Sequence, residues 1–167
     1  MIALRILDIK DFTSQLLIGD TFDAFWLSEA SVTTYVTFTI DGNLQKDFFD
    51  SALADSLHLN ERSYTLWKEV KPFCFQIMKG KRTPLNFKIN FLLSKPNTKK
   101  LLEQAGLPYT IDDIFGLCLT FQYDGTSLTC TTGTSLRMFT LDKSLDQVWD
   151  DMVVQFFKQK NIPVERL

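Results

Sequence analysis

The residue types that most often carry catalysis or bind metals are sparse in this chain. It has one histidine, His58, and three cysteines, Cys74, Cys118 and Cys130, at scattered positions. Structural zinc sites need about four clustered nitrogen or sulfur ligands. A Ser-His-Asp or Cys-His arrangement would have to use His58, which lies in a weakly patterned polar stretch. We therefore expect no metal and no cofactor, and we expect the thiols to be small, inert core groups.

Two pairs of adjacent carboxylates, Asp112-Asp113 and Asp150-Asp151, are the other candidates for acid and base chemistry. Neighbours in sequence usually diverge, and such residues are typical of helix starts and solvated faces. The seven glycines are dispersed, so no phosphate-binding loop is present, and there is no G-x-S-x-G motif. The sequence thus favours a protein that is not an enzyme. The enzyme alternative is a pocket that collects Asp112, Asp113, Thr129 and Thr131.

Charge is distributed unevenly along the chain. Residues 66–102 contain nine basic residues and one acidic residue, a local charge of +8, whereas the whole chain carries −2. Such a segment predicts a positive face that meets phosphates or an acidic partner. The alternative is a solvated face whose charges are neutralised by acidic segments, and the pI of about 5.4 argues against a dedicated nucleic-acid domain. The candidate binding residues are Lys79, Lys81, Arg82, Lys95, Lys99 and Lys100.

The segment 115–140 predicts a three-stranded antiparallel meander. Apolar and polar residues alternate on both sides of Asp124-Gly125, a strong hairpin signal. Any even loop length there gives one apolar face and one face of hydroxyl and amide groups. The same parity points Cys118 and Cys130 to opposite faces, which argues against a disulfide between them. The apolar set is Phe121 and Leu119 beside Leu128 and Cys130.

The first half of the chain predicts a strand, a helix and further strands. A second Asp-Gly signal, Asp41-Gly42, follows the alternating segment 34–40. A three-residue loop from Asp41 to Asn43 would place Ile40 opposite Leu44 and continue the apolar face to Phe48. A two-residue turn would pair Ile40 with Asn43 and turn the partner's apolar set to water, so we favour the longer loop. The predicted elements are a strand at 2–7, a helix at 8–18 and strands at 22–32 and 34–40.

Helical spacing replaces the alternation after residue 49. Apolar residues from Trp67 to Met78 form a stripe, with Pro72 either starting a second helix or kinking one long helix. The weakly patterned residues 50–63 are one short helix or a loop. Ser144 with Gln147 has the form of a capping box for the last helix. The remaining predictions are a strand at 85–93 and helices at 96–105 and 144–160.

These elements predict a single α+β domain, 1–167, with an antiparallel sheet covered by helices on one side. The two halves share an element order, which predicts two βαβββ pseudo-repeats at 2–48 and 85–140, a helical insertion at 50–79 and a C-terminal helix at 144–160. Sequence identity between the halves is negligible, so the shared order is also open to coincidence. No apolar run approaches the ~20 residues of a membrane span, and the first residues become charged too early for a signal peptide. We therefore expect a cytoplasmic protein.

Three segments resemble a family of uncharacterised bacterial cytoplasmic proteins, a domain of unknown function. They are LLIGDTFDAFWLSEASVTTYVTFTIDG (16–42), PFCFQIMKGKRTPLNFKI (72–89) and DGTSLTCTTGTSLRMFTLDKSLDQVWDDM (124–152). This resemblance implies no catalytic residue and no activity. A duplicated βαβββ unit with Asp-Gly hairpins also resembles, at the level of fold, one domain of a DNA sliding clamp. The helical insertion, the C-terminal helix and the acidic pI depart from that pattern.

The function hypothesis that follows is a non-enzymatic binding or interaction module. Its partner would be an acidic protein or nucleic acid, met by the basic segment around residues 79–82, or any partner met by exposed sheet edges. No membrane partner is expected. A structural homo-oligomer built through edge strands is a further alternative beside the enzyme.

Overall fold

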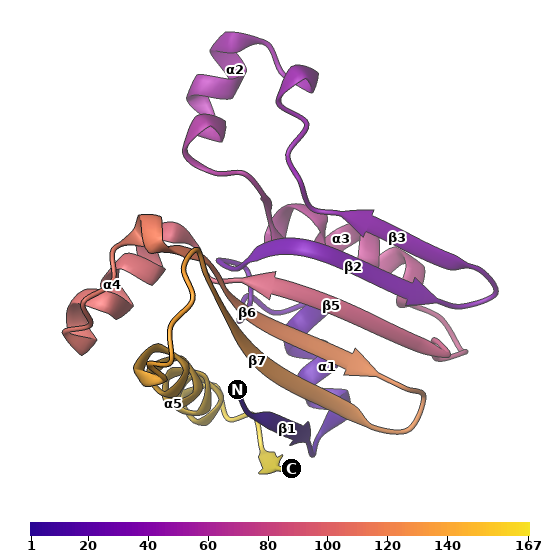
Figure 1. Ribbon diagram of the computed structural model, residues 1–167. Coiled ribbons are helices and arrows are strands. Elements are labelled where there is room, and N and C mark those ends of the chain that lie inside the picture. The colour runs from indigo at the N-terminus through magenta and orange to yellow at the C-terminus, as the bar shows by residue number, and fades with distance from the viewer.

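The computed structural model describes residues 1–167 and contains one antiparallel sheet of eight strands with five α-helices, an α+β fold as predicted (Figure 1). The strands are β1 (Ala3–Ile6), β2 (Trp26–Thr33), β3 (Thr37–Asp41), β4 (Thr65–Leu66), β5 (Asn86–Leu92), β6 (Ile114–Tyr123), β7 (Leu128–Leu136) and β8 (Val164–Arg166). The helices are α1 (Ile9–Leu17), α2 (Ser51–Ser56), α3 (Trp67–Met78), α4 (Lys95–Ala105) and α5 (Ser144–Gln159).

The strand order is β3-β2-β5-β6-β7-β1-β8, with β4 paired to β2 outside this path. Each half of the chain keeps the order strand, helix, strand, strand, as β1-α1-β2-β3 and β5-α4-β6-β7. The pairing within the halves differs, because β5, β6 and β7 are neighbours whereas β1 is separated from β2 by those three strands. The halves share element order, and a duplication stays a prediction.

None of the helices is both long and apolar enough to cross a membrane.

Helices cover one face of the sheet, where the core is built largely from phenylalanines. Figure 1 shows α1 and α3 behind the sheet, and α5 packs against β7. Phe22 lies at the centre of this core, fully buried, with its ring 5.5 Å from that of Phe12 and 5.4 Å from that of Phe121. Aromatic rings bury large apolar areas and favour such edge-to-face pairs. The predicted helical stripe is confirmed as one helix, α3, which contains Pro72 and buries Trp67, Cys74 and Met78.

The other face of the sheet is polar, and solvent reaches most of it. The register pairs Phe121 with Cys130 on the helix side and Gln122 with Thr129 on the opposite side, which confirms the predicted parity. Cys118 and Cys130 therefore point to opposite faces, and all three cysteines are free. On this side of the sheet, near β4, Tyr64 packs against Trp26. The side chains of the polar face include Ser31, Thr39, Lys88, Asn90, Thr120, Gln122, Thr129 and Thr131.

The predicted hairpin loop at residues 41–43 is wrong. The hairpin in this region joins β2 to β3, with Thr33 opposite Thr37, and residues 44–48 form no strand. Gly42 instead lies against β2, where its N–H donates to the Ser28 carbonyl at 2.9 Å. A Cβ on Gly42 would lie 1.7 Å from the Leu27 carbonyl oxygen. The glycine is needed for close backbone approach, and the chain then leaves the sheet.

Three further predictions of local structure need correction. The meander has two strands, because β7 continues to Leu136 and residues 137–143 form a loop. The strand predicted at 22–32 begins only at Trp26, since Phe22 and Phe25 occupy turns that direct their rings into the core. The capping box at Ser144 does not form: Asp142 accepts hydrogen bonds from the Ser144 N–H and hydroxyl, at 2.9 and 2.8 Å.

Candidate functional site

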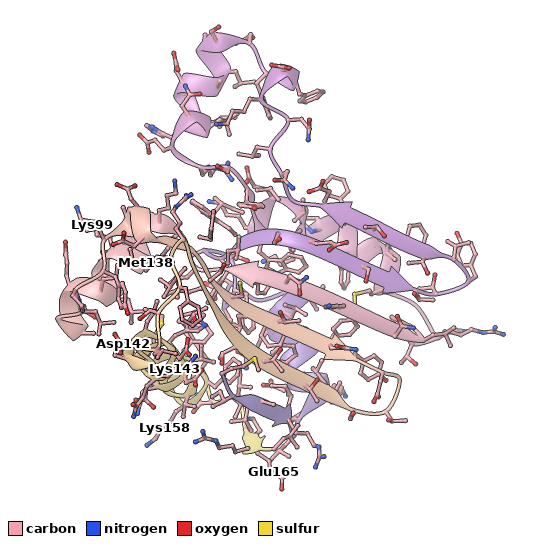
Figure 2. All side chains as sticks on the ribbon, viewed as in Figure 1. Lys99, Met138, Asp142, Lys143, Lys158 and Glu165 are labelled. Atoms are coloured by element: carbon pink, nitrogen blue, oxygen red, sulfur yellow. The ribbon has the colours of Figure 1, made fainter.

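The six predicted binding residues fall into two groups at opposite ends of β5. Lys79, Lys81 and Arg82 lie in the turn between α3 and β5 (the basic turn, residues 79–84), and the other three lie on α4, which follows β5. Figure 2 shows Lys99 on α4, far from the basic turn at the other end of the sheet. Seven strand residues at about 3.3 Å each separate the groups by roughly 20 Å. The structure therefore does not bring the two groups together. The α4 group is Lys95, Lys99 and Lys100.

The basic turn borders an apolar pocket of about 250 Å³. The pocket opens at the end of the sheet, where α1 and α3 meet β5 and β6. Its walls are mostly aliphatic and aromatic, and two of the cations predicted from sequence stand at its edge. The lining residues include Ile9, Leu17, Phe75, Met78, Phe87 and Tyr123, together with Lys79, Arg82 and Pro84 of the turn.

The shape of this pocket is fixed by well-defined contacts. The rings of Phe87 and Tyr123 are stacked with their centroids 5.3 Å apart, and the Tyr123 hydroxyl donates to the Gly125 carbonyl at 2.9 Å. Gly80 adopts a φ of +133°, a conformation that side chains other than glycine rarely tolerate. The turn is tied to the sheet where the Leu85 N–H donates to the Thr33 carbonyl at 2.8 Å. The pocket is thus a preformed feature of the fold.

The cations of the basic turn have no acidic partner in the structure. None of the ion pairs involves Lys79, Lys81 or Arg82. Two cations elsewhere in the molecule are neutralised: Lys71 lies 2.5 Å from an Asp23 oxygen, and Arg62 is paired with Glu69. Unpaired cations beside an apolar surface can attract an anion and desolvate it in part, which strengthens the attraction. The positive charge at this turn is therefore available to a ligand.

The carboxylates and hydroxyls of the enzyme hypothesis do not come together. Asp112 and Asp113 lie just before β6, beside the end of β7, where the Asp113 carbonyl accepts from the Arg137 N–H. Thr129 and Thr131 lie near the other end of β7, on the polar face. Hydrogen bonds from the N–H and hydroxyl of Thr110 hold the pKa of Asp113 below its usual range, as expected of a capping carboxylate. These four residues do not form a site.

The thiols lack the features of reactive cysteines. Burial raises the pKa of Cys74 to about 11, and burial also raises the pKa of Cys118 and Cys130. A thiol with a raised pKa holds little thiolate, which is the nucleophilic form. No three His, Cys, Asp or Glu side chains lie close enough together to hold a metal ion.

A second cleft, of about 470 Å³, lies between α4 and residues 57–62. It contains His58, which is exposed and lies 3.6 Å from a Glu61 oxygen. Arg62 and Glu69 meet there through two hydrogen bonds, at 2.5 and 3.1 Å. Because the opposite charges of Arg62 and Glu69 neutralise one another, they leave less charge to attract a ligand here than the unpaired cations provide at the basic turn.

Sequence reasoning predicted the cations of this candidate site but not the apolar walls beside them. Met78 belongs to the predicted helical stripe and Phe75 lies on the same helix. Phe87 and Tyr123 were assigned to strands with no link to the basic turn. The signal was present in part, since the turn joins α3 directly to β5 and so lies beside both. What could not be inferred is the position of α1, whose Ile9 and Leu17 complete the pocket from a distant part of the chain.

The fold and this site define an α+β domain with a helix-covered sheet, one polar sheet face and an apolar pocket beside an unpaired basic turn. The model of a family of unknown function, DUF5721, matches residues 15–165, and the chain belongs to this family. Neither the comparison with curated proteins nor that with solved structures finds a match.

Proposed function

We propose that the protein is a binding module that recognises an acidic segment of a partner protein at the basic turn. The observation that carries the proposal is the combination of an apolar pocket with unpaired cations, Lys79 and Arg82, at its edge. A matching segment presents an apolar side chain to the pocket and carboxylates to the cations. The three free thiols are consistent with action in the cytoplasm, where reducing conditions keep thiols unpaired.

A protein segment suits this site better than nucleic acid. Nucleic-acid surfaces present a continuous series of cations that follows the phosphate backbone. Here the two basic groups lie at opposite ends of β5, and Lys88 is the one cation of that strand between them. Phe87 and Tyr123 stack on each other as part of the pocket wall. Charge and apolar surface are thus combined in one small area.

The size of the pocket also favours an anchoring side chain over a whole cofactor or metabolite. Binding sites for drug-sized ligands usually measure about 300–1,000 Å³. The pocket here is about 250 Å³. A single aromatic or aliphatic side chain, flanked by acidic residues that stay near the surface, fits this volume and charge.

The test measures binding of a fluorescent acidic peptide with two adjacent phenylalanines between aspartates, followed by anisotropy. Matched peptides carry alanine in place of the phenylalanines, or asparagine in place of the aspartates. We expect the first peptide to bind, each matched peptide to bind about tenfold more weakly, and added salt to weaken binding. The variant Lys79→Glu with Arg82→Glu should lose binding, because both cations become carboxylates.

The control variant, Lys99→Glu with Lys100→Glu, makes the same charge change on α4 and should bind the peptide as the wild type does. If the α4 variant loses binding and the basic-turn variant keeps it, the proposed site is wrong.

A single-stranded oligonucleotide is tested on the same proteins. Tighter binding of the oligonucleotide than of the peptide, abolished by the basic-turn substitutions, would assign the turn to nucleic acid and overturn the proposal.

A further inference from the structure

One segment of this chain combines exposed aromatic side chains with carboxylates, the combination that suits the apolar pocket at the basic turn. Residues 43–64 (the arm) leave the sheet after β3, return at β4 and project from the rest of the molecule (Figure 1). Helix α2 in the arm buries none of its residues, and Phe48 is 84% exposed. Exposed apolar side chains gathered on one projecting segment mark an interaction surface. The other exposed apolar residues of the arm are Leu53 and Leu57.

Two carboxylates flank the aromatic residues of the arm, and Lys46 precedes the first of them. Asp47 and Asp50 flank Phe48 and Phe49 directly, and the two rings meet edge to face with their centroids 5.2 Å apart. Asp50 also caps α2, where it accepts a hydrogen bond from the Leu53 N–H at 2.7 Å. The α2 cap therefore holds this carboxylate in a fixed position close to the rings. The arm thus presents an aromatic group between two carboxylates.

This surface complements the pocket at the basic turn in both size and charge. An apolar cavity of about 150 Å³ holds a benzene molecule. The pocket, at about 250 Å³, therefore has room for one phenyl ring. Lys79 and Arg82 at its edge lack acidic partners within their own chain, and the aspartates beside Phe48 would supply them.

The arm is at the wrong end of the molecule to fill its own pocket. It leaves and rejoins the body at the start of β2, where Leu27 pairs with Thr65. The basic turn lies at the end of β2, where Leu85 bonds to Thr33. The eight residues of β2 separate these points by roughly 25 Å. Occupation of the pocket by the arm therefore requires a second molecule.

We propose that Phe48 of one copy of this chain enters the pocket of a second copy, with Asp47 and Asp50 facing Lys79 and Arg82. This inference rests on the proposed function, because it names the acidic partner of that site. The two surfaces are different, so a single contact leaves one copy with a free pocket and the other with a free arm. Two copies that exchange arms use both contacts and close into a two-fold dimer. Contacts that are not exchanged in this way continue into a chain of molecules or close into a ring.

The test is sedimentation velocity of the full-length protein over a wide range of concentration. The wild type should form reciprocal dimers or larger species, and more salt should dissociate them. Phe48→Ser and, separately, Lys79→Glu with Arg82→Glu should each weaken association about tenfold or more, because each removes one half of every contact. Both sites are exposed, so the melting temperatures should stay close to that of the wild type. Phe139→Ser, at a side chain 90% exposed in another loop, is the control and should associate normally.

Mixing the two defective variants gives the decisive result. The Phe48→Ser variant keeps its pocket and the basic-turn variant keeps its arm, so an equimolar mixture should form one-to-one dimers and nothing larger. A wild type that stays monomeric, a Phe48→Ser variant that associates like the wild type, or a mixture that stays monomeric would each overturn the inference. If the acidic peptide still binds at the basic turn in that case, only self-docking fails and the proposed function stands. If the peptide does not bind either, both fail.

Discussion

Asp124 organises the turn between β6 and β7 through four hydrogen bonds. Its carboxylate accepts from the N–H groups of Ser127 and Thr126, at 2.8 and 2.9 Å, and from both of their hydroxyls. These bonds, the backbone ones first, hold the pKa of Asp124 well below its usual range. Asp-Gly thus serves here as the hairpin signal that the sequence suggested: the aspartate side chain accepts hydrogen bonds across the turn, and Gly125 adopts a φ of +101°.

Replacing Asp124 with alanine should destabilise the protein in a pH-dependent way. The pKa of this group is lower in the folded state than in the unfolded state, so its contribution is complete above the unfolded value of about 3.9 and is lost as the pH falls below it. The difference in melting temperature between wild type and Asp124→Ala should therefore be largest near neutral pH and should shrink in acid. Thermal melts at a series of pH values measure this, with the exposed Asp151→Ala as control. A difference that stays constant or grows in acid would contradict the assignment.

The arm is attached to the sheet at its base, and Gly42 makes the closest backbone approach there. Its N–H bonds to the Ser28 carbonyl at a β-bulge in β2, and its carbonyl accepts from the Thr65 N–H at 2.8 Å. Both ends of the arm are thereby fixed to β2. At the level of elements, Gly42 determines where the arm leaves the sheet, and the rest of the arm makes little contact with the core.

Gly42→Ala should lower the free energy of unfolding by about 2–3 kcal/mol, because the added methyl group must displace backbone. Gly133→Ala is the matched control in β7. Its Cβ would meet only the Cys118 Cβ at 3.8 Å, an ordinary contact, so we expect a change within about 0.5 kcal/mol. Urea denaturation of the two variants measures both values. Equal effects would show that close approach at Gly42 is not limiting.

Local unfolding should be more frequent in some parts of the molecule than in others. Strands β5 and β6 have paired neighbours on both sides and carry Phe91 and Phe121 in the core, whereas the arm buries only Leu59. Backbone amides exchange with solvent at rates set by local opening, and well-packed central strands open least. Hydrogen exchange followed by mass spectrometry should show the slowest exchange in β5 and β6 and the fastest in the arm. The measurement is made at a protein concentration too low for self-docking, where arm amides as slow as those of β5 would contradict this prediction.

Sequence patterns predicted the parts of this fold that follow from local periodicity. The parity of Phe121 and Gln122, the helix-covered sheet and the helix from Trp67 to Met78 all depend on side-chain spacing, which is read directly from the chain. Contacts between distant segments were not predictable. Gly42 was interpreted as a turn because the approach of β2 has no local signature, and the pocket at the basic turn needs α1 and α3 to be placed side by side.

The strand order also has a consequence for synthesis on the ribosome. Strand β1 pairs only with β7 and β8, and the Ile2 N–H donates to the Thr132 hydroxyl, 130 residues further along the chain. The β2–β3 hairpin likewise lacks its neighbour in the sheet until β5 has been translated. The nascent chain therefore carries β1 without a partner until β7 has been translated, and non-local pairing of this kind folds slowly. Completion of the sheet thus follows translation of β7 and β8.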